Sequence, residues 1–417
     1  MLGALLLLAV DGAAASWFGR FQHGGRATAQ AGAFVARADD PGAVGYNPAA
    51  LARLPVSGLQ IGLDFDAPTL DSESPTGSAR AEHSIQFPPA LYYAWRPEDG
   101  PWAFAAGLDS PLWRFNDWQT QLFPGRWVAR RSEARLFELR AAAARTLGER
   151  WSLGAAVRYV QGEVGYGDAR RFEVEVPAGS FDVEIDRVAE ADADGAGLEV
   201  AAHYAAPRWG FGVTWESEVE LEGDGDLSYV VADPEQVPVE VAAAARAALP
   251  AGASTLTEGL PETLSAGVWF AATEHLRLEL DAALARWSSA PEASASHEPD
   301  RLGPAFELAR RSGWDDALSL RLGAEWALSP TWSLGAGLAF EPSPASGDAV
   351  EPGMPVGDVT VVSLGGSASL GWLTFDLGWS YHAADDLEAR DQEADPGVAT
   401  TYSAHAQVWS LSARWRL

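Results

Sequence analysis

The stretch "WSLGAAVRYV", residues 151–160, decides the fold. From Trp151 to Tyr159 its odd-numbered residues are apolar, and the residues between them are small, polar or charged. An alternation with a period of two predicts a β-strand that has one apolar and one polar face. The same pattern recurs in "WSLGAGLAF" from Trp332 and in "WLTFDLGWSYH" from Trp372. The predicted fold class is therefore all-β.

The composition narrows the class of protein. After the N-terminus no apolar run in the 417 residues approaches the ~20 residues of a membrane helix. This leaves a soluble β-protein, or a barrel whose membrane signal is spread over alternating residues. The net charge of −29 makes nucleic acids and anionic surfaces poor partners. The absence of Cys excludes disulfides, thiolate catalysis and Cys-ligated metals.

The spacing of the strands separates these two alternatives. The alternation predicts about fourteen strands, near 56–67, 80–96, 101–112, 133–147, 150–167, 188–206, 209–222, 262–273, 275–288, 315–328, 331–342, 358–371, 372–383 and 401–417. Short turns such as 147–150 alternate with long loops such as 113–132, 168–187 and 223–261. The last of these contains "VPVEVAAAARAAL", which is predicted to form an amphipathic helix. An even number of strands with short turns at one end and long loops at the other is typical of an outer-membrane barrel.

Aromatic residues support the barrel. Five tryptophans share one offset, a residue or two after a short turn, and are predicted to form an interfacial girdle: Trp102, Trp151, Trp209, Trp332 and Trp372. The last strand, "VWSLSARWRL" at 408–417, is amphipathic and ends on an apolar residue, as a strand recognised by the barrel-assembly machinery does. We therefore expect a transmembrane antiparallel β-barrel in the outer membrane of a Gram-negative bacterium.

The chain divides into three parts. The stretch "MLGALLLLAVDGAAA" predicts a signal peptide over 1–15, because an apolar run precedes small residues. Residues 55–417 are expected to form the barrel. Residues 16–54 lack the period of two and are expected to fold into the lumen as a plug of short helices, the hatch. Within it, Asn47 is predicted to cap the short helix of "NPAALARL", with Pro48 as its first residue.

The polar faces of the strands predict a charged lumen. It would be lined by Asp64, Glu138, Arg140, Arg158, Glu199, Glu216, Arg277, Glu279, Asp281, Arg321, Glu325, Asp376, Arg414 and Arg416. Because unpaired buried charge is costly, these groups should pair across strands or face water. A carboxylate ligand would need one or two arginines. Arg37, Arg140 and Arg158 are therefore candidates, although pairing among the lumenal charges is the simpler interpretation.

One stretch resembles a known family. "GAFVARADDPGAVGYNPAALARL", residues 32–54, is similar to the N-terminal hatch of the long-chain fatty acid outer-membrane transporters (FadL/TodX-like, OMPP1), whose hallmark is an Asn-Pro-Ala segment after an Ala- and Asp-containing run. The matching hatch residues are Asp39, Asp40, Asn47, Pro48 and Ala49. "FPPALYYAW" at 87–95, "GLDSPLWRFNDW" at 107–118 and the closing strand are also similar, so the resemblance spans nearly the whole chain.

The resemblance implies passive uptake of hydrophobic molecules, with long-chain fatty acids or related lipids as the expected substrates and aromatic hydrocarbons as the alternative. It implies three sites. An extracellular apolar groove would use the aromatic-rich loop residues Trp113, Phe115, Trp118, Leu122, Phe123 and Trp127. A lumenal pocket beside the hatch would use Phe34, Arg37, Arg140 and Arg158. A kink in the third strand would open a lateral exit at Gly107 and Pro111, residue types that weaken a strand or remove a ladder donor.

Other functions receive less support. None of the seven His lies beside a Ser in a recognisable nucleophile motif, so we expect no enzyme and no cofactor. "DADG" at 192–195 and "DGD" at 224–226 lack the regular ligand series of a calcium loop, so no metal site is expected. Such acidic loops would meet lipopolysaccharide through bridging cations. The expected partners are the hydrophobic ligand and outer-membrane lipid, with the chain a monomer. An ungated porin or a structural barrel remains the alternative.

Overall fold

The structure is a computed structural model and describes residues 24–82, 86–118, 123–232, 235, 237–249, 251–291, 293–297, 313–345, 350, 352–389 and 399–417. The predicted signal peptide, 1–15, and the first part of the predicted hatch, 16–23, lie outside the described residues. The helices are α1 (Gly25–Thr28), α2 (Ala43–Tyr46), η1 (Pro48–Arg53), η2 (Pro124–Trp127), α3 (Val239–Ala248) and η3 (Trp287–Ser289).

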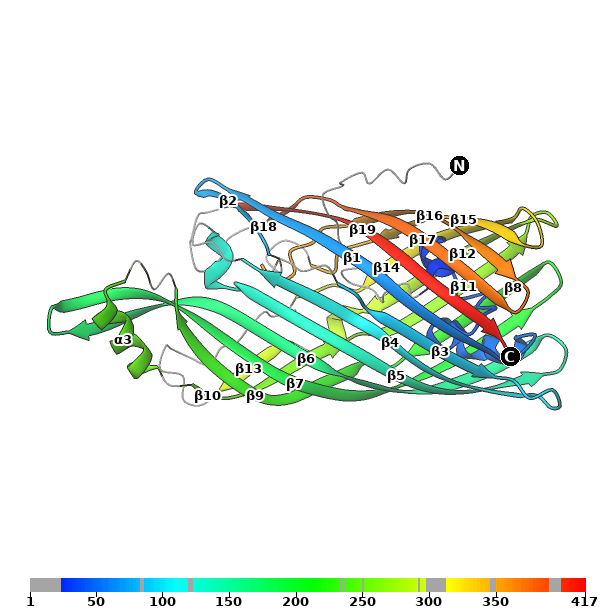
Figure 1. The fold of residues 1–417 in the computed structure, drawn as a ribbon, viewed down its shortest axis with the longest axis horizontal. Coiled ribbons are helices and arrows are strands. Elements are labelled where there is room, and N and C mark those ends of the chain that lie inside the picture. Colours follow the sequence, from blue (N-terminus) through cyan, green and yellow to red (C-terminus); the bar gives the residue numbers. More distant parts are fainter. Residues whose placement is uncertain are drawn as a thin grey trace.

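The strands form one closed antiparallel wall (Figure 1). They are β1 (Gly58–Ser74), β2 (Gly77–Arg80), β3 (Pro89–Trp95), β4 (Trp102–Asp117), β5 (Arg131–Leu147), β6 (Trp151–Val176), β7 (Gly179–Ala205), β8 (Trp209–Glu216), β9 (Val219–Val231), β10 (Gly252–Leu260), β11 (Glu262–Ala271), β12 (Leu276–Arg286), β13 (Ser294–His297), β14 (Ala317–Ala327), β15 (Trp332–Glu341), β16 (Val359–Leu370), β17 (Leu373–Ala384), β18 (Leu387–Ala389) and β19 (Thr400–Arg416).

Fourteen of these strands close the barrel, in the order β1, β3, β4, β5, β6, β7, β8, β11, β12, β14, β15, β16, β17 and β19. The closing pair is antiparallel, with Leu63 opposite Leu411 and Leu59 opposite Trp415. The remaining strands extend the wall at the end away from the short turns; β9 and β10, for example, pair with each other there. The predicted all-β barrel of fourteen strands is confirmed.

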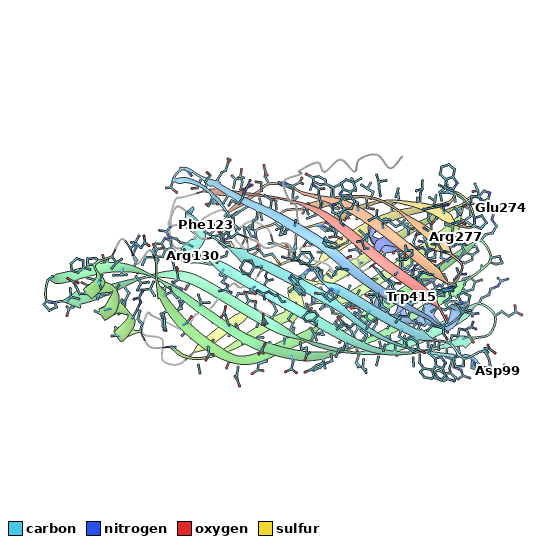
Figure 2. All side chains as sticks on the ribbon, viewed as in Figure 1. Asp99, Phe123, Arg130, Glu274, Arg277 and Trp415 are labelled. Atoms are coloured by element: carbon cyan, nitrogen blue, oxygen red, sulfur yellow. The ribbon has the colours of Figure 1, made fainter. Side chains whose placement is uncertain are left out.

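The outer face of the barrel is the one that the alternation predicts. The five girdle tryptophans, all at the short-turn end, have exposed fractions between 44% and 63%. In Figure 2, the labelled residues Asp99 and Glu274 mark the short-turn end, and Phe123 and Arg130 lie toward the opposite end. Because the long connections lie on the outside of the cell in such barrels, the short-turn end is periplasmic. No helix among the described residues is long and apolar enough to cross a membrane.

Two segments expected as long loops are corrected by the structure. Residues 168–187 belong to β6 and β7, which continue to a turn at 177–178. Residues 223–261 hold most of β9, the helix α3, which was predicted as amphipathic, and β10. Beyond the bilayer the outward positions become acidic, as at Asp192 and Asp224, while inward positions such as Val164 and Leu221 stay apolar and buried. The wall therefore continues above the membrane.

The interior differs between the two ends. Residues 24–54 lie inside the wall toward the periplasmic end, near the C-terminus, and pack small residues against β3 to β6 (Figure 1). In the extracellular half, apolar clusters fill much of the interior, and the buried ion pair of Arg114 and Glu258 lies in the same half. One cluster there gathers residues such as Leu136, Leu221 and Leu256. A second cluster contains Trp118 and Met354.

Candidate functional site

The hatch, residues 24–54 as described, is built around Asn47. The side-chain oxygen of Asn47 accepts a hydrogen bond from the Ala49 amide at 3.1 Å, which caps η1, and Pro48 is the first residue of that helix. The predicted cap is confirmed, although the helix is of the tighter 3₁₀ type. The Asn47 side-chain amide also donates to the Val35 carbonyl at 2.9 Å. One side chain therefore joins two parts of the hatch.

Two carboxylates of β12 hold the hatch backbone. Asp281 Oδ2 accepts hydrogen bonds from the amides of Phe34 and Val35, at 2.7 and 2.9 Å. Glu279 Oε1 accepts from the next two amides, those of residues 36 and 37, at 2.8 and 3.0 Å. Four consecutive backbone donors thus meet two buried anionic acceptors, which is a strong type of hydrogen bond. We call Glu279 and Asp281 the β12 carboxylate pair.

A cationic residue of the hatch makes a second anchor. Arg26 donates to Glu325 of β14 and to Asp39, both at 2.6 Å, and lies 3.3 Å from Asp40. Burial acts to raise the pKa of Asp39, but Arg26 and its neighbouring arginines outweigh it and hold that pKa well below its usual range. Burial raises the pKa of Asp40, and Arg414 and Arg26 offset this only in part. Asp39 is therefore the more firmly ionised of the two motif aspartates.

Glycines on the inner wall allow the hatch to lie against the strands. A Cβ atom at Gly154 of β6 would be 2.5 Å from the Ala49 nitrogen and 2.6 Å from the Pro48 carbonyl carbon. A Cβ atom at Gly378 of β17 would be 2.7 Å from Thr28 Cβ. Real Cβ atoms do not approach so closely, so the hatch backbone occupies the space that a side chain would need.

The residues predicted for a lumenal pocket form two separate groups. Phe34 is buried in the hatch, with Tyr46 edge-on at 5.4 Å. The guanidinium carbons of Arg26 and Arg37 lie 5.3 and 5.2 Å from the centre of the Phe34 ring. This group belongs to the hatch and to the strands that hold it.

The second group is an ionic cluster in the wall formed by β5, β6, β7 and β8. Arg140 pairs with Glu138 at 2.8 Å and with Glu199, and Arg158 pairs with Glu138 at 2.7 Å and with Glu216 at 3.0 Å. The expected cross-strand pairing of lumenal charges is found here. The ion pairs of this cluster join residues of the wall to one another, whereas Phe34 and Arg37 belong to the hatch.

The residues predicted for the extracellular groove do not form one surface. Trp118 and Phe123 are fully buried, with their rings stacked at 4.2 Å. Trp113 and Phe115 lie on the opposite face of β4 from the buried residues at 112, 114 and 116. The guanidinium carbons of Arg126 and Arg171 lie 4.3 and 5.0 Å from the ring centre of Trp127. The sixth residue, Leu122, lies outside the described residues.

The third barrel strand, β4, is irregular where a kink was predicted. Its register with β5 shifts between Asp109 and Leu112, a bulge that contains Pro111. Gly107 lies below the bulge, where a Cβ atom would be 3.0 Å from Val44 of the hatch. The extra residue reverses which side chains face outward. After it, residues 112, 114 and 116 face inward and Trp113 and Phe115 face outward, an exchange of faces that the sequence alone did not reveal.

Sequence reasoning missed the anchors of the hatch. Glu279 and Asp281 were expected only as lumenal charges, and His203 of β7, which donates from Nε2 to the Ala36 carbonyl at 2.8 Å, was not singled out. The available signal was the spacing of two in "ELD", which places both carboxylates of β12 on one face of a strand. That spacing does not reveal which backbone donors the carboxylates meet.

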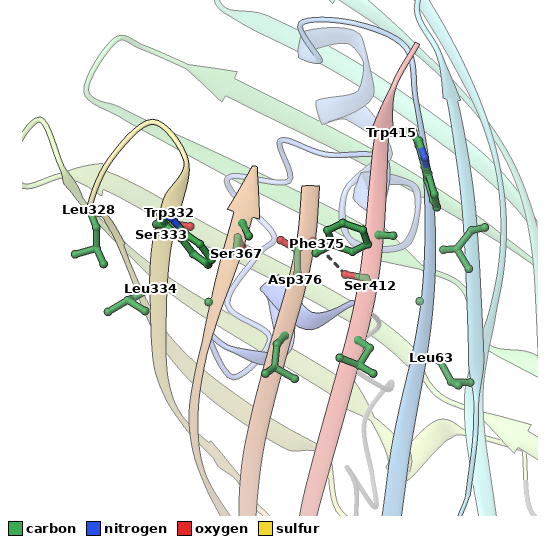
Figure 3. Close-up of a pocket in the computed structure, with 17 residues that line it drawn as sticks. Leu63, Leu328, Trp332, Ser333, Leu334, Ser367, Phe375, Asp376, Ser412 and Trp415 are labelled. Atoms are coloured by element: carbon green, nitrogen blue, oxygen red, sulfur yellow. Dashed lines mark hydrogen bonds between the residues drawn. The ribbon is translucent and has the colours of Figure 1, made fainter. Parts of the chain in front are cut away.

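A hollow of about 680 Å³ lies on the outer, membrane-facing side of β1, β15, β16, β17 and β19 (Figure 3). Its rim is formed by exposed apolar side chains such as Trp332, Phe375 and Leu411. Behind it, Ser412 donates to Asp376 at 3.1 Å and accepts from the Gly25 amide of the hatch at 3.1 Å. The hollow therefore belongs to the lipid-facing band and is separate from the lumen.

No group of three or more His, Asp or Glu side chains among the described residues is placed to hold a metal ion. The features that remain are a closed barrel, an apolar extracellular interior and an N-terminal segment docked inside the lumen. Together they define an outer-membrane β-barrel that holds a segment of its own chain inside the lumen. The family model of outer membrane transport proteins (OMPP1/FadL/TodX) matches residues 6–417, and the chain belongs to this family. It is a protein of the Gram-negative outer membrane.

Solved structures agree in fold. A FadL homologue of Pseudomonas aeruginosa is 16% identical, with a TM-score of 0.80 over 97% of this chain and 99% of that chain. The toluene transporter TodX of P. putida is 17% identical, with a TM-score of 0.73 over 95% and 98%. The toluene transporter TbuX of Ralstonia pickettii is 17% identical, with a TM-score of 0.66 over 95% and 99%. At these identities the likeness shows the fold alone. No curated protein sequence matches the chain.

Proposed function

We propose that the protein carries hydrophobic molecules passively across the outer membrane, through an extracellular apolar site, a lumenal pocket closed by the hatch and a lateral exit. The observation that carries this proposal is the contrast inside the barrel. The extracellular half of the lumen is lined by buried apolar residues, while the periplasmic half is closed by a hatch with charged anchors. An apolar lining favours an apolar solute over water and ions.

The ion pairs favour a neutral substrate over a fatty acid. The three arginines considered for a carboxylate ligand already have acidic neighbours: Arg140 and Arg158 pair with Glu138, and Arg37 has Glu279 at 3.7 Å. A ligand carboxylate would have to displace a buried protein carboxylate, which leaves that group unpaired at a large cost. Two of the similar structures are toluene transporters. Long-chain fatty acids remain the second candidate because the family resemblance includes them.

The lateral exit is proposed between β3 and β4. The pairing of these strands ends at Leu91 opposite Leu108, just below the bulge of β4 that contains Pro111. Above that point Trp113 packs against Val408 of β19. Among the described residues above this point, β4 pairs with the chain that precedes β3 only at Asp117 opposite Glu82. This interruption of the pairing supports an opening through which an apolar molecule reaches the bilayer.

Binding to the purified barrel tests this function. Radiolabelled naphthalene and palmitate would be measured with the parent chain and with a variant that lacks residues 16–46. We expect saturable naphthalene binding that is lost with the hatch residues, and weaker palmitate binding. The opposite preference would assign a fatty acid as substrate. No saturable binding of either probe, with a parent chain that already conducts ions and keeps the same conductance after the deletion, would leave an aqueous porin.

A further inference from the structure

The connection between β15 and β16 enters the extracellular half of the barrel. Its segment 352–357, "PGMPVG", has no regular secondary structure, and all six residues are buried. A buried segment outside helices and strands must find partners for its backbone groups elsewhere. The partners of this segment show what holds it in place.

Side chains of β4 and its flank bind the carbonyl groups of segment 352–357. Trp118 Nε1 donates to the Pro352 carbonyl at 3.0 Å, and Asn116 Nδ2 donates to the Gly353 carbonyl at 2.9 Å. At the other end Ser343 donates to the Val356 carbonyl at 2.7 Å. Each of these bonds is a single contact to a neutral side chain, and water can replace it at small net cost. The segment is therefore held by replaceable bonds.

The side chains of segment 352–357 fill an aromatic chamber. Met354 and Val356 are buried in the same cluster as Trp118, Phe123 and Tyr402. The Tyr402 ring meets the stacked rings of Trp118 and Phe123 edge-on, with centroids at 6.0 and 6.3 Å. Offset and edge-on aromatic faces are the surroundings that a flat apolar ligand prefers. Here a flexible thioether and an isopropyl group occupy them.

The chamber lies beside the proposed exit. Arg114 and Asn116, which contact segment 352–357, are buried on the inward side of β4 directly above its bulge. Arg114 also pairs with Glu258 at 3.0 Å, so it offers no unpaired charge that would favour an anionic ligand. The chamber is thus apolar, charge-balanced and close to the irregular part of the wall.

We propose that the chamber of Trp118, Phe123 and Tyr402 is a binding site for neutral aromatic molecules, and that segment 352–357 occludes it in the resting protein. The ligand enters by displacing Met354 and Val356. This inference rests on the proposed function and adds to it a site and a means of control. Because the ligand can bind only while the chamber is open, its apparent affinity equals the affinity of the open chamber multiplied by the fraction of time for which segment 352–357 is displaced.

A single cysteine can report displacement, because the chain has no cysteine of its own. In a Met354→Cys variant of the purified barrel, the thiol should react slowly with a polar maleimide, and added naphthalene should accelerate the reaction severalfold. Palmitate serves as the anionic comparison and should have a smaller effect. A labelling rate that saturating naphthalene leaves unchanged would overturn the proposal.

A substitution that weakens the segment without removing the chamber tests the same idea independently. Trp118→Phe keeps an aromatic ring and removes the donor to the Pro352 carbonyl. We expect it to tighten naphthalene binding by about three- to tenfold, the value of one hydrogen bond in the competing closed state. The control is Trp287→Phe, a second buried tryptophan of the same cluster, which packs edge-on against Trp314 at 5.2 Å. It should leave naphthalene affinity unchanged.

The outcomes separate this proposal from the function on which it rests. Saturable naphthalene binding to the parent, without tightening in Trp118→Phe, would retain the transporter and reject the occlusion. Equal tightening in both tryptophan variants would assign the effect to general loosening of the core and would also reject it. Absence of saturable binding in every variant would reject both the occlusion and the transport function.

Discussion

At the scale of single residues, the hatch depends on a few buried atoms that meet its backbone. The β12 carboxylate pair accepts four consecutive amide hydrogens, and the inner wall has glycines where the hatch backbone passes. Both features act on main-chain atoms and so do not depend on the side chains of residues 34–37. They explain how a segment of small residues is held firmly.

Removing the charges of the β12 carboxylate pair should release the hatch. Hydrogen bonds to charged groups are worth about 1.5–3 kcal/mol each, and Glu279→Gln with Asp281→Asn weakens four of them. In a background with Ala36→Cys as the only thiol, we expect maleimide labelling to rise at least about tenfold, the effect of 1.4 kcal/mol. Glu258→Gln, an equally buried carboxylate in the extracellular half, is the control. Unchanged labelling in the double variant would contradict the anchoring role.

A methyl group at an inner-wall glycine should displace η1. In Gly154→Ala the new Cβ would overlap Pro48 and Ala49, and overpacking of this kind costs about 1–3 kcal/mol. We expect faster hydrogen exchange over residues 48–53. Gly366→Ala is the matched control, because its Cβ lies on the membrane-facing side, with Ser333 O at 3.1 Å as its nearest neighbour. Equal exchange in the two variants would show that η1 adapts without cost.

At the scale of elements, the strands within the bilayer were predictable and the parts above it were only partly so. The alternation that begins at Trp151 predicted strands whose ends agree with the structure to within a few residues at the short turns, because lipid selects apolar outward positions there. Above the membrane this selection is lost. The acidic outward positions of β7 and β9 therefore look like loop residues in the sequence.

In the candidate site, too, the sequence predicted the features that depend on neighbouring residues and not those that depend on distant contacts. The cap at Asn47 depends on local sequence and was predicted correctly. The burial of Trp118 beneath segment 352–357 depends on a contact between residues more than two hundred positions apart. Periodicity carries no information about such a contact, so a buried aromatic residue was expected to line an open groove. The bulge at Pro111 could be suspected from its residue type, but its effect on the facing of Trp113 could not.

The extended hairpin of β6 and β7 should respond to pH. Asp186 lies some nineteen residues from the periplasmic end of β7, well beyond the ~9–11 residues that cross a bilayer. Burial raises its pKa to about 6, Glu184 adds to the effect, and the ion pair with Arg130 at 2.5 Å opposes it. The folded hairpin therefore binds a proton more tightly than the unfolded chain, whose Asp pKa is about 3.9.

The direction of the pH dependence follows from the higher pKa of Asp186 in the folded hairpin. The contribution of Asp186 to the stability of the hairpin is fully present below about pH 3.9 and is lost as the pH rises through about 6, because the ionised carboxylate is disfavoured in the fold. We expect stronger hydrogen-exchange protection of residues 181–187 at pH 5 than at pH 7.5. In Asp186→Asn the difference between the two pH values should be reduced. Protection that increases with pH in the parent would show that the ion pair with Arg130 dominates instead.

At the scale of the whole molecule, we propose that the barrel has two closures in series, the hatch at the periplasmic end and segment 352–357 in the extracellular chamber. Between them the inner wall carries more carboxylates than guanidinium groups. Among the described residues, the inner-wall acids include Asp64, Asp66, Asp109, Glu138, Glu199, Glu216, Glu279, Asp281, Glu325, Glu341 and Asp376, and the inner-wall arginines include Arg140, Arg158, Arg277, Arg321 and Arg414. Opening both closures should therefore expose an acidic passage.

Ion conductance across planar bilayers tests this arrangement. Deletion of residues 24–46 alone, or Met354→Ser with Val356→Ser alone, should leave most barrels closed, because the other closure remains. The combined variant should conduct, and in a KCl gradient its reversal potential should have the sign of a cation-selective pore, since fixed negative charge attracts K⁺ and repels Cl⁻. An anion-selective combined variant would refute the acidic passage. Full conductance after deletion of the hatch alone would show that segment 352–357 is not a second closure.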